Sequence, residues 1–438
     1  MQELLARAAA RRERLMQTIT SGTIVIPAAR LRLRSADSEY TFRQDSDFYY
    51  LTGFDEPDAV CVLQPAKPEA RLVLFVRPKN REAEIWSGRR AGVDNAMHVY
   101  GANVAYSIED LDARLPELLS DVDTLYYAWG RDPALDALVQ RIVDEHRRTR
   151  ARRGKGIVQM HDPGTILHEM RLVKDDFEMQ QMRAAIAAAA AGHLRAMQDT
   201  RAGMREFELE AMIEYEFRRR GARGPAYGTI VGGGDNANTL HYRENNAVLQ
   251  TGQLVLIDAG AEMDLYAADI TRTFPIGPRF SDAQRDLYAV VLEAQKQAIA
   301  TVRPGASFEA PHQRALRVLC EGMVELGLVA GPPERALSSS DYRRFYMHRT
   351  SHWLGLDVHD VGLYAVEGEA RTFEPGMILT VEPGLYVAAD QEGVPDRFRG
   401  IGIRIEDDIL VTAGGHEVLT EAVPKEIDAL EALRAAAA

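Results

Sequence analysis

The sequence predicts a globular protein built from two mixed α/β domains. The chain has 438 residues, more than one hydrophobic core usually supports, so two domains are expected. Both halves alternate short apolar runs typical of strands with longer segments typical of helices. A long helix beginning at Asp175 or Asp176 opens the second half. We therefore place the first domain at residues 1–172 and the second at residues 173–438.

The first domain is expected to contain short strands and helices. Apolar runs predict strands at residues 59–63 and 71–76. An amphipathic pattern predicts a short helix at residues 110–119, which contains Pro116. Residues 146–155 are rich in arginine, and two interpretations stay open for them, a solvated helix end or loop and an anion site.

The second domain also alternates predicted helices and strands. Amphipathic periodicity and glycine or proline stops predict three helices, at residues 175–198, 204–220 and 282–302. The last ten residues, 429–438, are expected to be a frayed helix or disordered. Apolar runs predict four strands, at residues 254–259, 267–274, 377–381 and 402–410.

Composition excludes several classes of protein. The net charge of −13 disfavours a general nucleic-acid binder, which would carry a basic face. Two cysteines, Cys61 and Cys320, are too few for a disulfide framework or a cysteine-ligated metal, and each is expected to be buried. The longest apolar run, residues 184–191, is far shorter than the roughly 20 residues of a membrane span. The basic amino terminus lacks an apolar signal core, so a cytoplasmic protein without nucleic-acid or membrane partners is expected.

Two aspartates flank a predicted hairpin. With a turn around Met263 and Asp264, Asp258 and Asp269 are equally far from the turn and are expected to be cross-strand neighbours. Like charges so close repel each other, and a divalent cation between them would remove the conflict. Two solvent-facing aspartates are the alternative, although Asp258 ends an apolar run and should be at least partly buried.

Two glutamates stand in similar positions. Strict alternation over residues 401–406 places Arg404 and Glu406 on one face of a strand, opposite three isoleucines. A solvated strand face with an ion pair would give the same pattern. Glu382 follows the apolar run 377–381 and precedes Pro383, which is the end of a buried strand, where a glutamate needs a partner.

Three histidines, His348, His352 and His359, lie within twelve residues. Histidine is the commonest metal ligand and the usual acid or base near neutral pH. Arg349 stands where a zinc helix of the H-E-x-x-H type needs glutamate, which excludes that type. Four carboxylates with one or more histidines favour Mn²⁺ or a related ion, and two ions balance the charge better than one. The residues thus predict a two-metal hydrolase of unspecified substrate.

The loop at residues 228–242 carries a glycine triplet. A phosphate cradle would need a G-x-x-x-x-G-K-[ST] run or a strand–GxGxxG–helix unit, and the sequence contains neither here. The phosphate interpretation is therefore rejected.

Five of these residues, with their flanks, resemble the ligands of the pita-bread metallopeptidases, most closely the bacterial Xaa-Pro aminopeptidase (aminopeptidase P) family. The family order Asp, Asp, His, Glu, Glu matches Asp258, Asp269, His352, Glu382 and Glu406. Residues 44–60 and 84–90 also resemble the creatinase-type amino-terminal domain of this subgroup. The resemblance covers nearly the whole chain and implies a creatinase-like α/β domain followed by a pita-bread catalytic domain.

The resemblance implies a dinuclear-metal aminopeptidase that hydrolyses the bond between the first residue and a penultimate proline. Asp269 and Glu406 would bridge two ions, Asp258 would bind one, and His352 and Glu382 the other. A metal-bridging hydroxide would be the nucleophile. The ions are expected to be Mn²⁺, with Zn²⁺, Co²⁺ or Fe²⁺ as alternatives.

Roles beside the metals follow from the same resemblance. His241, delivered by the loop at residues 228–242, and His359 would contact substrate and stabilise the tetrahedral intermediate. Glu382 would handle a proton, and Arg404 would orient the site.

Substrate contacts and assembly are also implied. Tyr386 would pair with Arg404, and His348 would contact the proline pocket. The partners would be peptides with proline at position 2. The family implies a homodimer or homotetramer in which the amino-terminal domain, including Trp86, shapes a neighbouring site.

Other activities share this fold. A prolidase, which cleaves only Xaa-Pro dipeptides, has the same ligands and is the alternative. Methionine aminopeptidase is disfavoured by the extra amino-terminal domain of about 170 residues, and creatinase lacks the full ligand set. An inactive pita-bread binding module is disfavoured because such relatives lose ligands, and all five are present here.

Overall fold

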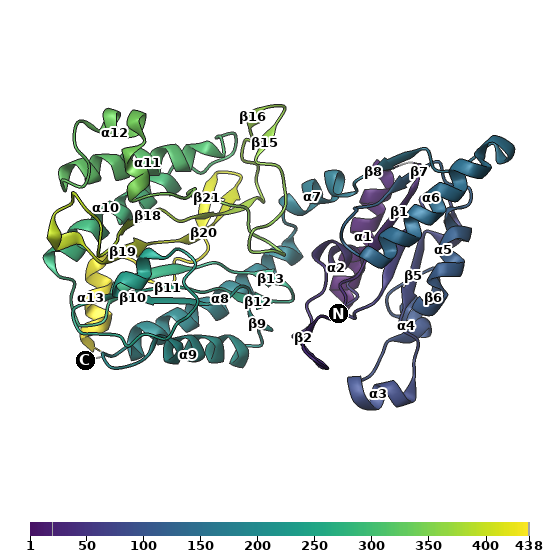
Figure 1. Cartoon of the computed structure of the whole chain (residues 1–438), viewed down its shortest axis with the longest axis horizontal. Helices are drawn as coiled ribbons and strands as arrows, with labels where there is room; N and C mark the ends of the chain where they lie inside the picture. The colour runs from purple at the N-terminus through teal and green to yellow at the C-terminus, as the bar shows by residue number, and fades with distance from the viewer. Residues whose placement is uncertain (20, 437–438) are drawn as a thin grey trace. The chain divides into compact units, whose positions relative to one another are not determined.

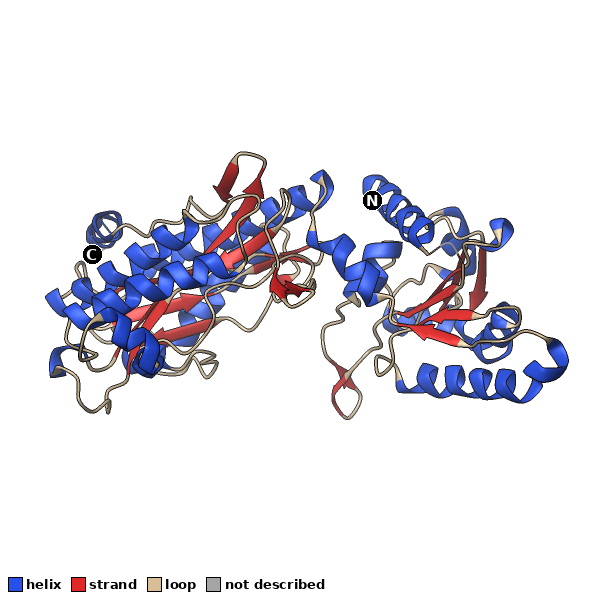
Figure 2. Ribbon diagram, turned by 90° about the horizontal axis from the view of Figure 1, so that it is seen from above, coloured by secondary structure: helices blue, strands red, loops and turns tan. Residues whose placement is uncertain are grey.

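The computed structural model describes residues 1–19 and 21–436. The chain forms two compact units, Met1–Met170 and Arg171–Ala438 (Figure 1). The division lies within helix α7 (Gly164–Leu172), and the domain boundary expected from the sequence, after residue 172, coincides with the end of that helix. In each unit the strands are flanked by helices (Figure 2).

The first unit is organised around a six-stranded mixed sheet of order β6-β5-β4-β1-β7-β8. The pairs β1–β4 and β4–β5 are antiparallel, and the remaining pairs are parallel. The expected strands at residues 59–63 and 71–76 are β4 and β5. The strands of this unit are β1 (Thr23–Pro27), β2 (Leu33–Ser35), β3 (Ser38–Glu39), β4 (Val60–Leu63), β5 (Leu72–Val76), β6 (Val104–Ser107), β7 (Thr124–Tyr126) and β8 (Gln159–His161).

Apolar side chains of the sheet and of α5 and α6 form the core of this unit, among them Val62, Phe75, Leu119 and Leu138. The helix expected at residues 110–119 is α5, which contains Pro116. The helices are α1 (Gln2–Thr18), α2 (Ser46–Thr52), α3 (Arg81–Ser87), α4 (Gly92–His98), α5 (Leu111–Leu119), α6 (Pro133–Arg153) and α7.

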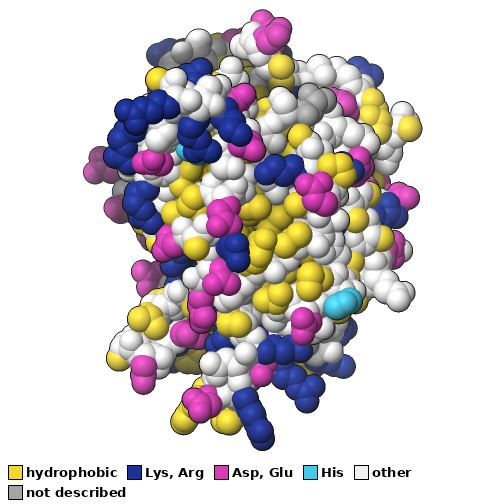
Figure 3. All heavy atoms as spheres, turned by 90° about the vertical axis from the view of Figure 1, so that its right-hand side faces the viewer, with side chains coloured by type: hydrophobic (Ala, Val, Ile, Leu, Met, Phe, Trp, Pro, Cys, Tyr) yellow, Lys and Arg dark blue, Asp and Glu magenta, His cyan; other side chains and the backbone are white. Residues whose placement is uncertain are grey.

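The arginine-rich stretch forms the last turns of α6, which ends at Arg153 with Gly154 in the left-handed conformation. Arg147 and Arg148 pair with Asp144 and Glu145 one turn earlier, at 3.3 and 2.7 Å. Figure 3 shows a face on which Lys and Arg side chains gather toward the upper left, with Asp and Glu side chains beside them. The stretch is therefore a helix end, as one interpretation predicts, and the anion site stays a prediction.

The second unit consists of several small sheets with helices around them (Figure 1). Helices α8 and α9 pack as one pair, and α10 and α11 as another. The helices are α8 (Asp176–Asp199), α9 (Glu206–Arg219), α10 (Asp282–Ile299), α11 (Glu309–Glu325), α12 (Pro333–Ser339) and α13 (Ile427–Ala436). The strands are β9 (Gly224–Pro225), β10 (Ile230–Gly233), β11 (Leu254–Asp258), β12 (Ala261–Met263), β13 (Tyr266–Ala267), β14 (Thr271–Pro275), β15 (Ala365–Val366), β16 (Glu369–Ala370), β17 (Ile378–Val381), β18 (Gly384–Val387), β19 (Ile401–Arg404), β20 (Asp407–Thr412) and β21 (Gly415–Val418).

Local sequence explains the ends of these helices. Asp175 caps α8 through a capping box with Glu178, as its position before the alanine-rich run predicts. Of the two alternatives expected for the last ten residues, a frayed helix or disorder, the helix is confirmed for residues 429–436, which belong to α13; residues 437–438 lie outside the described residues. Arg434 anchors this helix because its buried guanidinium donates to four backbone carbonyls, including Met197 O and Pro275 O.

The hairpin after β11 differs in register from the expected one. Asp264 and Leu265 both have positive φ (47° and 68°) and form its turn, one residue later than predicted. Asp258 therefore pairs with Thr271, not with Asp269. Asp269 precedes β14, so the two aspartates are not direct cross-strand neighbours.

One negative finding concerns membranes. In the part of the chain that the structure describes, none of the helices combines the length and apolar character that crossing a bilayer requires.

Candidate metal centre

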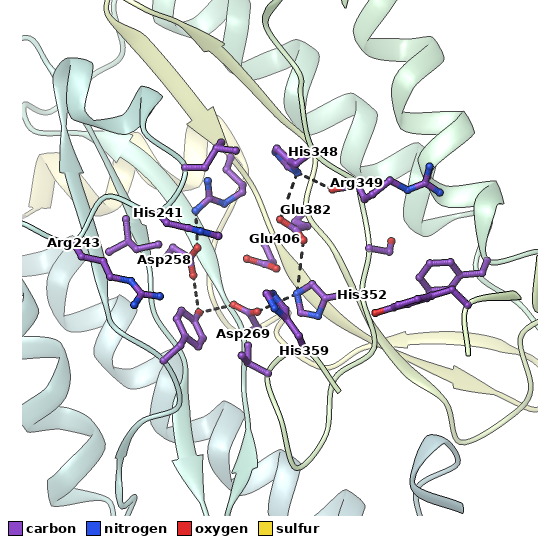
Figure 4. A pocket seen from close by; sticks show the side chains of 18 of the residues that line it. His241, Arg243, Asp258, Asp269, His348, Arg349, His352, His359, Glu382 and Glu406 are labelled. Atoms are coloured by element: carbon purple, nitrogen blue, oxygen red, sulfur yellow. Dashed lines mark hydrogen bonds and ion pairs between the residues drawn. The ribbon is translucent and has the colours of Figure 1, made fainter. Parts of the chain in front are cut away.

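A cavity of about 810 Å³ lies in the second unit and collects most of the predicted site residues. Figure 4 shows the carboxylates of Asp258, Asp269, Glu382 and Glu406 directed toward the same space as His352. The predicted residues that line the cavity are His241, Asp258, Asp269, His348, His352, His359, Glu382, Arg404 and Glu406.

Asp258 and Asp269 are brought together by a tyrosine. The hydroxyl of Tyr227 lies 2.6 Å from Asp258 Oδ1 and 2.5 Å from Asp269 Oδ1. Burial and the charges of both aspartates raise the pKa of Tyr227 well above its ordinary value, so it stays a neutral donor. Tyr227 thus links the two aspartates, which the predicted cross-strand pairing does not do.

Glu406 lies at a break between two strands. The expected strand 402–410 is divided into β19 and β20, and Glu406 stands between them. Its amide donates to Thr271 O at 3.1 Å, and its carboxylate accepts from Thr271 Oγ1 at 2.6 Å. Arg272 Nη1 donates to the Glu406 carbonyl at 2.5 Å. These contacts fix Glu406 beside β14, close to Asp269.

His352 and Glu382 come from neighbouring segments. Glu382 stands between β17 and β18, where its amide donates to Thr350 O at 2.8 Å, while the amide of Thr380 donates to His352 O. His352 Nδ1 lies 2.9 Å from Trp353 O, which turns Nε2 toward Asp269 and Glu382, at 3.4 and 3.7 Å. This geometry presents one imidazole nitrogen to the carboxylates, as a metal-ligating histidine requires.

The donor set fits divalent cations. Ligand atoms of Asp269, His352 and Glu406 all lie within 4.8 Å of one another. Burial first, and then neighbouring carboxylates, raises the pKa of Asp269 and Glu406 above ordinary values. Although burial lowers the pKa of His352, the hydrogen bond with Asp269 and the charge of Glu382 raise it to about 9. Raised pKa values mean that the cluster carries more negative charge than neighbouring basic groups neutralise, so a cation would stabilise its ionised form. Carboxylate oxygens are hard donors, which favour hard divalent ions.

Arg404 connects the aspartate end of the cavity to the histidine end. Its Nη2 lies 2.6 Å from Asp258 Oδ2, and its Nη1 donates to the Tyr386 hydroxyl at 3.1 Å. That hydroxyl lies 2.9 Å from His348 Nε2. Burial, and then the charge of Arg404, lowers the pKa of His348 to about 3, so the imidazole is neutral. The predicted pairing of Arg404 with Tyr386 is therefore present.

The remaining predicted residues divide into two groups. His241 and His359 line the cavity, and the ring of His359 lies 4.4 Å from that of His352, centroid to centroid. Trp86 belongs to α3 in the first unit, where it is 90% exposed and is absent from the cavity lining.

Known proteins match this chain over nearly its whole length. Residues 180–413, which include all five predicted ligands, match the model of metallopeptidase family M24. The chain belongs to metallopeptidase family M24. Residues 8–126 match the amino-terminal domain of aminopeptidase P. These two matches confirm the expected fold class, a creatinase-like α/β domain followed by a pita-bread catalytic domain.

Individual members of the M24 family are similar to the chain. It is 44% identical to an Xaa-Pro aminopeptidase of Escherichia coli K12, over 98% of this chain and 97% of that one. It is 34% identical to human Xaa-Pro aminopeptidase 3, over 97% of this chain and 84% of the other. A solved structure of aminopeptidase PepP from Pseudomonas aeruginosa superposes with a TM-score of 0.96 at 47% identity, covering 99% and 98% of the two chains.

Sequence reasoning missed several residues of this M24 site. Tyr227 and Thr271, which hold three of the carboxylates, were not singled out. Thr271 follows Asp269 by two positions, so strand alternation could have placed it on the same side. Tyr227 lies 31 residues before Asp258 and is separated from it by a loop, so no local pattern links them.

Proposed function

We propose that the chain removes the first residue from peptides with proline in second position, as a metal-dependent Xaa-Pro aminopeptidase. The observation that carries the proposal is the convergence of Asp258, Asp269, His352, Glu382 and Glu406 on one cavity that is large enough for a peptide end. The names of the similar proteins support the same activity.

The proposed site holds two divalent ions. Asp269 and Glu406 would contribute to both ions, Asp258 would hold one of them, and His352 and Glu382 would hold the other. When bound, such ions supply a nucleophilic water near neutral pH and polarise the scissile carbonyl. We propose Mn²⁺ because the donor set is four carboxylates and one imidazole.

The side chains around the ions would orient the substrate and move its protons. Glu382, at the cavity wall, would take a proton from the attacking water and deliver it to the proline nitrogen that leaves. His241 and His359 would donate to the carbonyl oxygen as negative charge develops on it. Arg404 holds Asp258 and Tyr386 in place through the contacts described above.

The proline pocket and the arginines of the cavity wall bear on the length of the substrate. His348 and Tyr386 would form one wall of the proline pocket. A strict dipeptidase needs a free cation to receive the product-side carboxylate. Arg349 and Arg404, on the cavity wall, are paired with Glu309 and Asp258, whereas Arg243 on the same wall has no ion pair among the described residues, so the dipeptidase stays the alternative that the following test addresses.

The test compares an Xaa-Pro dipeptide with the Xaa-Pro-Xaa tripeptide extended by one residue. We expect the tripeptide to be cleaved after its first residue with kcat/KM at least about tenfold higher, because the additional residue contributes binding energy. Chelation should abolish activity, and Mn²⁺ should restore it. Cleavage of the dipeptide alone would favour prolidase. Protein purified without chelator that binds no metal and stays inactive with Mn²⁺ would favour a binding module.

We further propose a homodimer or homotetramer in which Trp86 contacts a neighbouring subunit. An indole that is 90% exposed, next to Ile85 at 74%, is typical of an interface rather than of free surface. Trp86→Ala should therefore shift the sedimentation profile toward smaller species and weaken tripeptide cleavage. Trp129→Ala, which removes another exposed indole of the same unit (50%), serves as the control. An unchanged oligomer and unchanged activity in Trp86→Ala would refute the role.

A further inference from the structure

The segment of residues 229–253 carries His241 and, beyond β10, has little regular structure of its own. It contains the glycine triplet, a short 3₁₀ turn (Gly234–Asn238) and then irregular backbone up to β11. His241 lies in this irregular part, with an exposed side chain on the cavity wall. Something outside the segment must hold it, because exposed irregular backbone is otherwise among the less rigid parts of a protein.

The buried carboxylate of Glu206 fixes the segment through hydrogen bonds. Glu206, the first residue of α9, is 0% exposed. Its Oε1 accepts from Gly233 N at 2.7 Å and Asn236 Nδ2 at 2.9 Å. Its Oε2 accepts from Tyr242 OH at 2.8 Å and Ala247 N at 2.9 Å. All four donors belong to the segment and lie on both sides of His241.

The same face of α9 continues the contact. Glu210 and Glu214 follow Glu206 at intervals of four residues, so the three side chains lie along one side of the helix. Asn245 Nδ2 donates to Glu210 Oε2 at 3.0 Å, and Thr229 Oγ1 donates to Glu214 Oε1 at 3.2 Å. We call Glu206, Glu210 and Glu214 the glutamate row. The glutamate row accepts hydrogen bonds from the segment between residue 229 and residue 247.

The glycine triplet fits this arrangement. A Cβ at Gly233 would lie 2.6 Å from a methyl group of Leu249 and 3.4 Å from Glu206 Oε1. Gly234 has a φ of +56°, which favours glycine. Glycine is thus required at Gly233 by the close approach of Leu249 and favoured at Gly234 by its positive φ, so neither position needs a phosphate to explain it.

We propose that Glu206 is the positioning residue for His241. It touches neither the cavity nor the predicted ligands, and it acts by fixing Tyr242, the residue next to His241, together with backbone amides on either side. The inference rests on the proposed function, in which His241 contacts the substrate.

The test uses Glu206→Gln, which keeps the shape but replaces one acceptor oxygen with a donor. Of the four segment donors, those that faced that oxygen then lose their acceptor. We expect kcat/KM on the Xaa-Pro-Xaa tripeptide to fall about tenfold to a hundredfold, the cost of a misplaced catalytic group. In a His241→Ala background the same substitution should cost less than about twofold, because the residue that it positions is gone.

Glu216→Gln is the matched control. Glu216 is a buried glutamate of the same helix (3% exposed) that pairs with Arg219 and Arg220 and makes no contact with the segment among the described residues. We expect it to leave kcat/KM unchanged in both backgrounds. If Glu206→Gln fails to fold, Tyr242→Phe removes a single donor and should give a smaller loss that also disappears with His241→Ala.

Amide hydrogen exchange separates this inference from the proposed function. Peptides covering residues 229–247 should exchange faster in Glu206→Gln than in the wild type, and peptides of α10 should not. An active wild type in which Glu206→Gln loses nothing, or loses equally in both backgrounds, would overturn the positioning role and leave the proposed function intact. A wild type inactive on every Xaa-Pro peptide would overturn both.

Discussion

Asp269→Asn should lower kcat/KM on an Xaa-Pro-Xaa tripeptide by about a thousandfold, equivalent to about 4 kcal/mol of transition-state stabilisation. Asp269 is 5% exposed and is one of three residues whose ligand atoms lie within 4.8 Å of one another. An amide of the same shape still accepts the Tyr227 hydrogen bond but removes the negative charge that two cations would share. Activity should therefore fall together with metal affinity.

Two further measurements make this prediction specific. Calorimetric titration with Mn²⁺ should show weaker or incomplete binding, and the rise in Tm on adding Mn²⁺ should shrink, because stabilisation by a ligand follows its affinity. Asp286→Asn, which removes a partly exposed aspartate 3.1 Å from Arg397, is the control and should leave both properties unchanged. Near wild-type Mn²⁺ binding in Asp269→Asn would refute its place between the ions.

Arg272→Met should destabilise the protein by about 3–5 kcal/mol, the cost of leaving a buried charge without its partner. Arg272 and Asp407 are both 0% exposed, and Nη2 lies 2.7 Å from Asp407 Oδ1. Lys425 also pairs with Asp407, which keeps the loss from being larger. Urea unfolding at neutral pH measures the effect. Arg397→Met, which breaks an exposed pair, should cost less than about 1 kcal/mol.

The sign of the pH dependence of this destabilisation follows from the pKa of Asp407. Burial raises the pKa of Asp407, but Arg272 and Lys425 outweigh it and hold the pKa below its ordinary value. In the wild type, the contribution of Asp407 to the free energy of unfolding is present above an unfolded pKa of about 3.9 and is lost as pH falls through the folded value. Without Arg272 the folded pKa of Asp407 is higher than in the wild type, so the difference between the two free energies of unfolding should narrow as pH falls from the folded pKa of the variant toward that of the wild type. A constant difference would contradict this account.

The same substitution should also affect the site. Arg272 Nη1 donates to the carbonyl of Glu406, at the break between β19 and β20. Loss of that bond frees the backbone that carries the carboxylate, so Mn²⁺ affinity should fall even under conditions where the variant is folded.

Candidate ligands could be singled out from the sequence where an acidic residue stands beside a local pattern, whereas the choice of His352 among three histidines came from the resemblance to the pita-bread family. Asp258 and Glu382 end apolar runs that became β11 and β17, and Glu406 follows an alternating run that became β19. An acidic residue at the end of a buried strand costs free energy unless it is paired, so the pattern itself indicates a partner. The helix α8 was equally predictable, since its capping box is contained within four consecutive residues.

The pairing register of the hairpin after β11 was harder to predict from the sequence. The turn of the hairpin depends on two residues with positive φ, Asp264 and Leu265, and leucine gives no indication of that conformation. An error of one residue in the turn changes which residues face each other across the hairpin. The choice between a helix and disorder at the C-terminus was left open for a similar reason, because Arg434 stabilises α13 through carbonyls more than 150 residues away.

The sequence by itself indicated which carboxylates need partners and which strand ends carry them, because strand period and burial are local properties. Only the tertiary structure decided how they are held. Tyr227 joins two aspartates, Arg272 fixes Glu406, and Glu206 fastens the segment of His241. The hydrogen bonds Tyr227–Asp269, Glu206–Tyr242 and Arg272–Glu406 join residues that lie 42, 36 and 134 positions apart in the chain. No sequence period connects such distant residues, and their meeting depends on how the whole second unit packs.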